Sequence, residues 1–168
     1  MYPKILFPGK SQFSDFNASA SDKIINSLNP FSWIETVRQL NIIMPDIIIF
    51  QYWHPFFSPA FQFISKRIKL VSKAKIIANC NNVFPHEKFF MSKRLALMFF
   101  KYVDHFIVMS TSVKQDLHKI YPLANCIELK HPVYDIFGKR ISKDIARLKL
   151  SLKSEKIILF FGMIRDYK

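Results

Sequence analysis

Short blocks of apolar residues recur along the chain at intervals that predict buried strands. They occupy residues 47–51, 75–80, 105–109 and 126–129, and Ile is the commonest residue in them. The first block, IIIFQ, has no alternation of apolar and polar positions. Such a run is typical of a strand that is covered on both faces, as in a parallel sheet. We therefore expect four buried strands.

Helical spacing of apolar residues fills the intervals between these blocks. Asn29 suits the N-cap of one helix and Pro30 its first turn, and Ser58 and Pro59 open the next helix. The apolar stripe of that second helix consists of Phe57, Phe61, Ile64, Ile68 and Val71. Further helices are expected at 88–102, after a cap near Ser112, and at 143–150.

Strand and helix thus follow one another at the spacing of βαβ units. The predicted fold class is α/β, with a Rossmann-like parallel sheet and flanking helices. Pro132 and Gly138 indicate a linker, and IILFF at 157–161 predicts one more buried strand. The expected organisation is a domain at 1–130, a linker with a short basic helix at 131–155, and the first strand and turn of a second domain at 156–168.

Composition narrows the classes of function. The chain of 168 residues carries a net charge of +13, which attracts nucleic acid, acidic lipid or a phosphorylated substrate. Nucleic acid is disfavoured because most aromatic residues lie in apolar runs and not among exposed cations. Three glycines are too few for a glycine-rich phosphate loop. The cations Lys66, Arg67, Lys69 and Lys73 lie close together, and we expect them to contact an anionic membrane surface peripherally.

The cysteines and the apolar runs bear on location. Cys80 and Cys126 are isolated and lack the spacing of a metal site, so buried, reduced thiols are favoured over a disulfide. The longest apolar run, 42–50, contains Pro45 and Asp46 and is too short to cross a bilayer. The N-terminus lacks the apolar centre of a secretory signal. We expect a cytoplasmic protein that contacts the inner face of the membrane peripherally.

Candidate chemistry lies where strands end, because ligands of open parallel sheets bind beyond the carboxyl ends of the strands. His54 follows the first strand between aromatic residues, and a structural role is favoured over a sugar contact. Asn81, Asn82, His86 and Glu87 follow the second strand. Amides, an imidazole and a carboxylate together can orient a polyhydroxyl substrate and move protons, but the same loop also fits a capped helix start. The two interpretations of this loop stay open.

The last two strands are followed by simpler patterns. Residues 110–112, Ser-Thr-Ser, are best explained as helix N-caps. Arg165 and Lys168 stand three residues apart at a strand-to-helix turn, where such cations can bind a diphosphate. Composition alone would favour ordinary surface cations there. The chain has no Asp-x-Asp pair, so a metal site is not expected, and no catalytic residue is assigned.

Taken in order, PDIIIFQYWHPFFSPAF, NNVFPHE, DHFIVMSTSVKQDL, HPVYDIF and FFGMIRDYK resemble the bacterial glycosyltransferases of family four, which have the two-domain GT-B architecture. The resemblance runs from about Tyr2 to Lys168. It implies retaining, metal-independent transfer from a nucleoside diphosphate sugar to a glycan or lipid-linked acceptor, with no further cofactor. It places Arg165 and Lys168 at the donor diphosphate, and His54, Asn81, Asn82, His86 and Glu87 in the acceptor-side cleft.

Two departures from the family qualify this expectation. The family's opening strand, glycine-rich turn and first helix are missing, and the chain stops soon after the donor domain begins, so it is expected to be a fragment truncated at both ends. Asn81 stands where the family tends to have His, and an amide cannot shuttle a proton. We expect the isolated chain not to transfer sugar. The alternative function is a non-catalytic basic α/β domain that binds an anionic membrane surface or partner.

Overall fold

A computed structural model of the chain describes residues 22, 24–84, 91–130, 138–153 and 156–159. The chain divides into two compact units, Met1–Lys130 and His131–Lys168.

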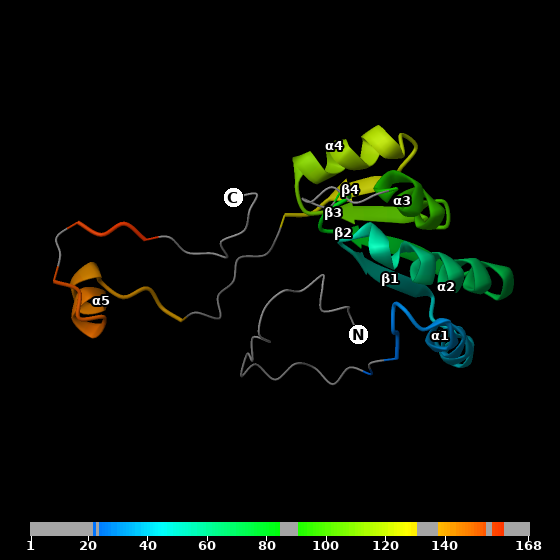
Figure 1. Ribbon diagram of the computed structural model, residues 1–168, viewed down its shortest axis with the longest axis horizontal. Helices are drawn as coiled ribbons and strands as arrows, with labels where there is room; N and C mark the ends of the chain where they lie inside the picture. The colour runs from blue at the N-terminus through cyan, green and yellow to red at the C-terminus, as the bar shows by residue number, and fades with distance from the viewer. Residues whose placement is uncertain (1–21, 23, 85–90, 131–137, 154–155, 160–168) are drawn as a thin grey trace. The chain divides into compact units, whose positions relative to one another are not determined.

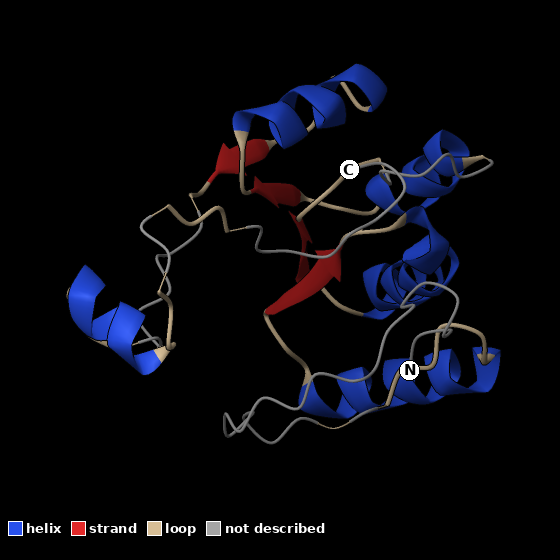
Figure 2. Ribbon diagram, turned by 60° about the vertical axis from the view of Figure 1, so that its left-hand side comes forward, coloured by secondary structure: helices blue, strands red, loops and turns tan. Residues whose placement is uncertain are grey.

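The first unit contains one sheet of four parallel strands (Figures 1 and 2). The strands are β1 (Ile47–Tyr52), β2 (Lys75–Cys80), β3 (His105–Val108) and β4 (Cys126–Glu128). Their order in the sheet is the same as their order in the chain. The predicted α/β class and the parallel sheet are therefore confirmed, with strand ends that differ from the prediction by at most one residue.

Helices precede and connect these strands. They are α1 (Pro30–Ile43), the short 3-10 helix η2 (Pro55–Phe57), α2 (Ser58–Val71), α3 (Ser92–Phe100) and α4 (Thr111–Ile120). Asn29 caps α1 as predicted, because its side chain accepts a hydrogen bond from the Phe31 N–H at 3.0 Å. The cap of α4 is Ser110, and Ser112 lies inside the helix. Helix α3 is shorter than predicted, and residues 88–90 lie outside the described residues.

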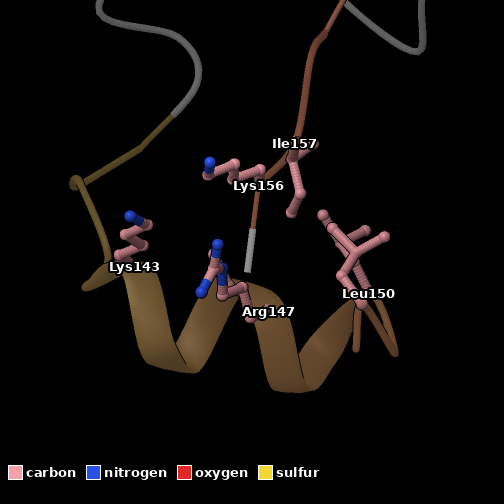
Figure 3. A pocket seen from close by; sticks show the side chains of 7 residues that line it. Lys143, Arg147, Leu150, Lys156 and Ile157 are labelled. Atoms are coloured by element: carbon pink, nitrogen blue, oxygen red, sulfur yellow. The ribbon is translucent and has the colours of Figure 1, made fainter. Parts of the chain in front are cut away.

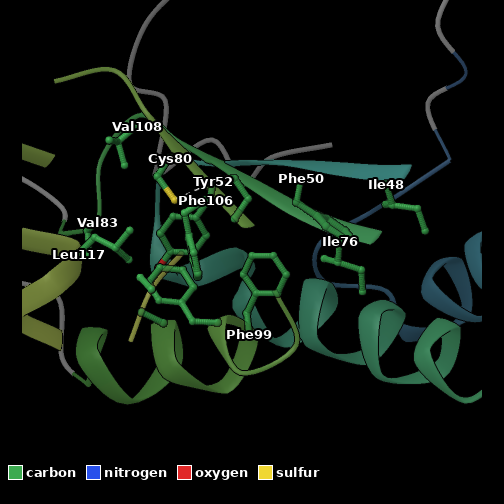
Figure 4. Packing of buried hydrophobic residues seen from close by; sticks show 14 of the residues in the cluster. Ile48, Phe50, Tyr52, Ile76, Cys80, Val83, Phe99, Phe106, Val108 and Leu117 are labelled. Atoms are coloured by element: carbon green, nitrogen blue, oxygen red, sulfur yellow. Dashed lines mark hydrogen bonds between the residues drawn. The ribbon is translucent and has the colours of Figure 1, made fainter. Parts of the chain in front are cut away.

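The core lies between the sheet and these helices. Side chains at alternate strand positions, such as Phe50, Tyr52 and Phe106, point toward α2, α3 and α4 (Figure 4). Phe99 and Phe100 of α3 are fully buried and meet them. The Phe99 ring lies 5.2 Å from the Phe50 ring, and the Phe100 ring lies 4.9 Å from the Tyr52 ring. An aromatic cluster thus joins β1, β3 and α3.

The opposite face of β1 is exposed, so the predicted coverage of both faces was wrong for this strand. Ile47 is 54% exposed and Ile49 is 58% exposed. The cause is topological: crossovers between parallel strands are right-handed, and an unreversed strand order then places every connecting helix on the same face. Val71, which was expected in the buried stripe of α2, is also exposed because it is the last residue of that helix.

The second unit contains α5 (Lys143–Lys149), which the Ser142 hydroxyl caps by accepting a hydrogen bond from the Ile145 N–H at 3.4 Å. The predicted strand at 157–161 is not seen at 157–159, where Ile158 and Leu159 are exposed. A strand needs a neighbouring strand for its backbone groups, and the described residues of this unit offer none. Residues 160 and 161 lie outside the described part.

Candidate functional site

The carboxyl ends of the four strands meet at one edge of the sheet. Tyr52 pairs with Cys80, and Cys80 pairs with Val108, so the residues that follow these strands start from adjacent positions. The Asn81 N–H donates to the Tyr52 carbonyl at 2.9 Å and fixes the exit of β2 beside that of β1. The structure therefore brings the start of the 81–87 loop next to the aromatic turn that contains His54.

His54 has a structural task in that turn. Its Nδ1 accepts a hydrogen bond from the Phe56 N–H at 3.1 Å and caps η2. Because Nδ1 acts as the acceptor, a neutral imidazole carries its proton on Nε2. The Trp53 ring lies 5.8 Å from the His54 ring and 5.0 Å from the Phe57 ring. This geometry accords with the structural role favoured for His54, whose contact with a ligand stays a prediction.

Asn81 and Asn82 lie at the same edge, directly after β2. Asn81 is exposed and Asn82 is half-buried, while the next residue, Val83, is buried in the core and anchors the loop. Neither side-chain amide hydrogen-bonds within the described part of the chain. Each amide offers one acceptor and two donor hydrogens, which is the complement of a sugar hydroxyl.

The ends of β3 and β4 add a contact that sequence reasoning missed. The Thr111 hydroxyl donates to the Glu128 carboxylate at 2.9 Å. The two residues lie 17 positions apart, and only the pairing of β3 with β4 brings them together. The Ser110 hydroxyl accepts a hydrogen bond from the Val113 N–H at 3.3 Å, so its predicted capping role is confirmed. Glu128 thus places a carboxylate at the edge where the candidate amides lie.

Buried polar atoms lie near the carboxyl ends of β1 and β2. The hydroxyls of Tyr52 and Ser58 and the Oδ1 atom of Asn79 are buried. Burial raises the pKa of the Tyr52 phenol, and the nearby Ser58 hydroxyl lowers it in part without completing a hydrogen bond of good geometry. The phenol therefore stays neutral at physiological pH.

Four of the candidate residues lie outside the described residues. They are His86 and Glu87 in the loop after β2, and Arg165 and Lys168 near the end of the chain. Their roles in the acceptor-side cleft and at the donor diphosphate stay predictions. Of the acceptor-side set, the structure places His54, Asn81 and Asn82 after neighbouring strands.

The basic group at the end of α2 is partly engaged within the unit. The Lys69 ammonium donates to the Asp104 carboxylate at 2.7 Å. The Arg67 guanidinium lies 5.5 Å from the centre of the Phe63 ring. Lys66 and Lys73 are exposed. Fewer cations than the sequence suggested are therefore available here to an anionic surface, and membrane contact stays a prediction.

The described residues form neither a metal-ligand cluster nor a membrane-spanning helix. Within the ranges that the structure describes, no three His, Cys, Asp or Glu side chains come together as a metal would need. Within the same ranges, no helix is long and apolar enough to cross a membrane. Both cysteines are free thiols, Cys80 buried and Cys126 half-buried, so the disulfide that the sequence left open is not formed.

Comparison with known proteins adds no relative. No family model matches the chain, and neither a curated protein nor a solved structure matches it.

Proposed function

We propose that the first unit is a Rossmann-like, acceptor-side domain of a nucleotide-sugar-dependent glycosyltransferase with GT-B architecture. The observation that carries the proposal is the convergence of Trp53, Asn81 and Asn82 at the carboxyl edge of a parallel sheet. This edge is where open α/β sheets bind their ligands. The ordered resemblance of the chain to family-four glycosyltransferases supports the same assignment.

Each residue has a proposed task that fits its chemistry. The Trp53 ring offers an apolar face to one side of a sugar ring. The amides of Asn81 and Asn82 donate to and accept from sugar hydroxyls. His54 holds the turn that presents Trp53, since its Nδ1 is occupied by the Phe56 N–H. These groups bind and orient an acceptor, either a glycan or a lipid-linked saccharide. The Trp53 ring and the amides of Asn81 and Asn82 do not transfer a proton.

The acceptor site is tested by titrating the full chain with a panel of methyl glycosides while tryptophan fluorescence is recorded. The chain has two tryptophans, so Trp33→Phe leaves Trp53 as the reporter. Replacing Asn81 and Asn82 together with alanine is expected to weaken the binding about tenfold, because each lost hydrogen bond contributes roughly 0.5–1.5 kcal/mol.

The matched control is Asn125→Ala. Asn125 is exposed and precedes β4, so it lies at the opposite end of the sheet, where its amide contacts the His105 ring at 2.9 Å. Its replacement is expected to leave the affinity for glycosides unchanged. An equal loss of affinity in both variants, or no glycoside binding by the parent chain, would contradict the proposed site.

Transfer itself is expected to be absent in the isolated chain. Donor and acceptor must be held together, and such positioning supplies on the order of 7–11 kcal/mol of the barrier in well-oriented systems. Under the proposal, Arg165 and Lys168 contact the donor diphosphate and the donor is enclosed by a second domain. Incubation with nucleoside diphosphate sugars and detection of released nucleoside diphosphate tests this expectation. Turnover by the 168-residue chain would contradict it.

A further inference from the structure

A hollow of about 430 Å³ lies beside α5 in the second unit (Figure 3). Arg147, which lines it, already takes part in an interaction within the structure. Residues 154 and 155 stand in the chain between the lining residues Leu152 and Lys156 and lie outside the described residues. No ligand is therefore assigned to this hollow.

Glu128, in the first unit, is defined by described contacts alone. It is the last residue of β4, at the carboxyl edge of the sheet, and it is half-buried. The Thr111 hydroxyl donates to its Oε1 at 2.9 Å. Its other oxygen, Oε2, has no hydrogen-bond or ion-pair partner within the described part of the chain. The carboxylate therefore has acceptor sites left at the edge where open α/β sheets bind their ligands.

The contact with Thr111 fixes where this carboxylate lies. Thr111 is the first residue of α4, and Glu128 pairs with Val108 at the end of β3, the strand that leads into that helix (Figure 1). The N-cap of α4 is Ser110, so the helix does not need the Thr111 hydroxyl in order to start. A side chain that is already held by a hydrogen bond loses fewer rotamers when a ligand binds. Thr111 is thus a positioning residue for Glu128.

Glu128 and the amides of the candidate acceptor site start from one row of the sheet. Cys80, which Asn81 follows, pairs with Val108, and Val108 pairs with Glu128. Two strand spacings of about 4.8 Å therefore separate the exit of β2 from Glu128, which is about 10 Å along the edge. A saccharide of two rings spans that distance, so one ligand can contact the amides at one end and the carboxylate at the other.

We infer that Glu128 determines which saccharides the proposed acceptor site takes. Its carboxylate accepts hydrogen bonds from two adjacent hydroxyls of the saccharide, while Asn81 and Asn82 contact hydroxyls nearer the end of β2. The substrate class is a neutral saccharide with a free vicinal diol, because the carboxylate of a uronate would meet the like charge of Glu128. The inference rests on the proposed acceptor-site function and names the chemistry that this site selects.

Other charges also act on an approaching saccharide. The net charge of +13 attracts anionic sugars at long range. Burial raises the pKa of the Cys126 thiol, the Lys114 ammonium lowers it in part and the Glu128 carboxylate raises it, so this cation and this carboxylate both lie near Cys126. The effect of Glu128 alone is therefore measured as a change in selectivity between the parent chain and a variant of that residue.

The test is titration of the full chain carrying Trp33→Phe, followed by the fluorescence of Trp53. The ligands are methyl β-cellobioside, methyl β-lactoside and methyl α-maltoside, and the uronate form of each. Glu128→Gln keeps an oxygen that can accept from Thr111 but removes the charge and one acceptor. It is expected to weaken the binding of the neutral disaccharides about tenfold and to lower the preference for neutral over uronate ligands severalfold. Thr111→Val should weaken the binding severalfold and keep the preference, because Glu128 keeps its charge.

The matched control is Asp116→Asn, which removes one negative charge from α4 at a residue that is paired with Lys119. It should change the affinity and the preference less than twofold, and a change as large as that of Glu128→Gln would show a general charge effect and overturn the inference. If Glu128→Gln changes neither quantity while the replacement of Asn81 and Asn82 weakens the binding, the inference about Glu128 fails and the proposed acceptor site stands. If the parent chain binds none of the disaccharides, the acceptor site itself fails, and the inference fails with it.

Discussion

Phe99→Ala is expected to lower the free energy of unfolding of the first unit by about 3–5 kcal/mol. Phe99 is fully buried, and its ring lies within 5.4 Å of the rings of Phe50 and Phe61. Alanine removes the ring and leaves a cavity among residues that already interlock, so the neighbours relax only in part. The loss is a large share of the stability of an ordinary domain, about 5–15 kcal/mol.

Urea unfolding followed by tryptophan fluorescence measures this loss, because Trp33 and Trp53 both belong to the first unit. Phe31→Ala is the matched control. Phe31 is also a helical phenylalanine, but it is 80% exposed, and its replacement should cost less than about 0.5 kcal/mol. Similar losses in the two variants would mean that the aromatic cluster around Phe99 does not carry the stability of the fold.

Local chemistry allowed the elements of the first unit to be predicted. Asn29 and Pro30 mark the start of α1 because an N-cap acceptor and a residue without an N–H both suit the first turn. The Pro59 signal for α2 works in the same way. These signals involve groups within a few positions of each other, so they do not depend on how the rest of the chain folds.

The coverage of the strands could not be predicted in this way. Residues 47–50 of β1, IIIF, are all apolar, yet Ile48 and Phe50 are buried while Ile47 and Ile49 are exposed. Which face receives helices depends on the order of strands in the sheet, and a run of apolar residues does not contain that order. The strand expected at 157–161 is absent at the described residues 157–159 for a related reason, since strand formation depends on a neighbouring strand.

Part of the candidate site could be predicted from the sequence. The rule that ligands bind beyond strand ends selected Asn81 and Asn82, and the register of β1 with β2 places them beside the turn of His54. The contact between Thr111 and Glu128 could not be found, because it depends on the pairing of β3 with β4.

Asp104 joins three elements of the first unit and is the second residue whose replacement should have a large effect. Its Oδ2 accepts a hydrogen bond from the Ile76 N–H at 2.7 Å, and its Oδ1 accepts one from the Lys69 ammonium at 2.7 Å. The Asp104 N–H donates to the Ile76 carbonyl at 2.8 Å. The side chains of Asp104 and Lys69 are each less than one-third exposed, so water screens this pair less than a surface pair.

Asp104→Ala is expected to lower the free energy of unfolding by about 1–3 kcal/mol, because it leaves the Ile76 N–H without its acceptor and Lys69 without its counter-ion. Asp104→Asn retains an oxygen for Ile76 and should lose less. Asp116→Ala is the control: it breaks only the surface pair with Lys119, at 2.8 Å, and should cost less than about 0.5 kcal/mol. A cost equal to that of the control would show that the Asp104 contacts contribute little.

The pH dependence of the unfolding free energy shows how much the charge of Asp104 contributes, apart from the shape of its side chain. Partial burial raises the pKa of Asp104, but the Ile76 N–H and the Lys69 ammonium outweigh it and hold the pKa below its usual value. A carboxyl whose pKa is lower in the folded state contributes stability above its unfolded pKa, about 4, and this contribution is lost as the pH falls through the folded value. The difference in unfolding free energy between the parent chain and Asp104→Asn should therefore be constant near neutral pH and shrink below about pH 4. Urea unfolding at a series of pH values measures it, and a difference that stayed constant into strong acid would mean that the charge of Asp104 adds nothing to the stability of the fold.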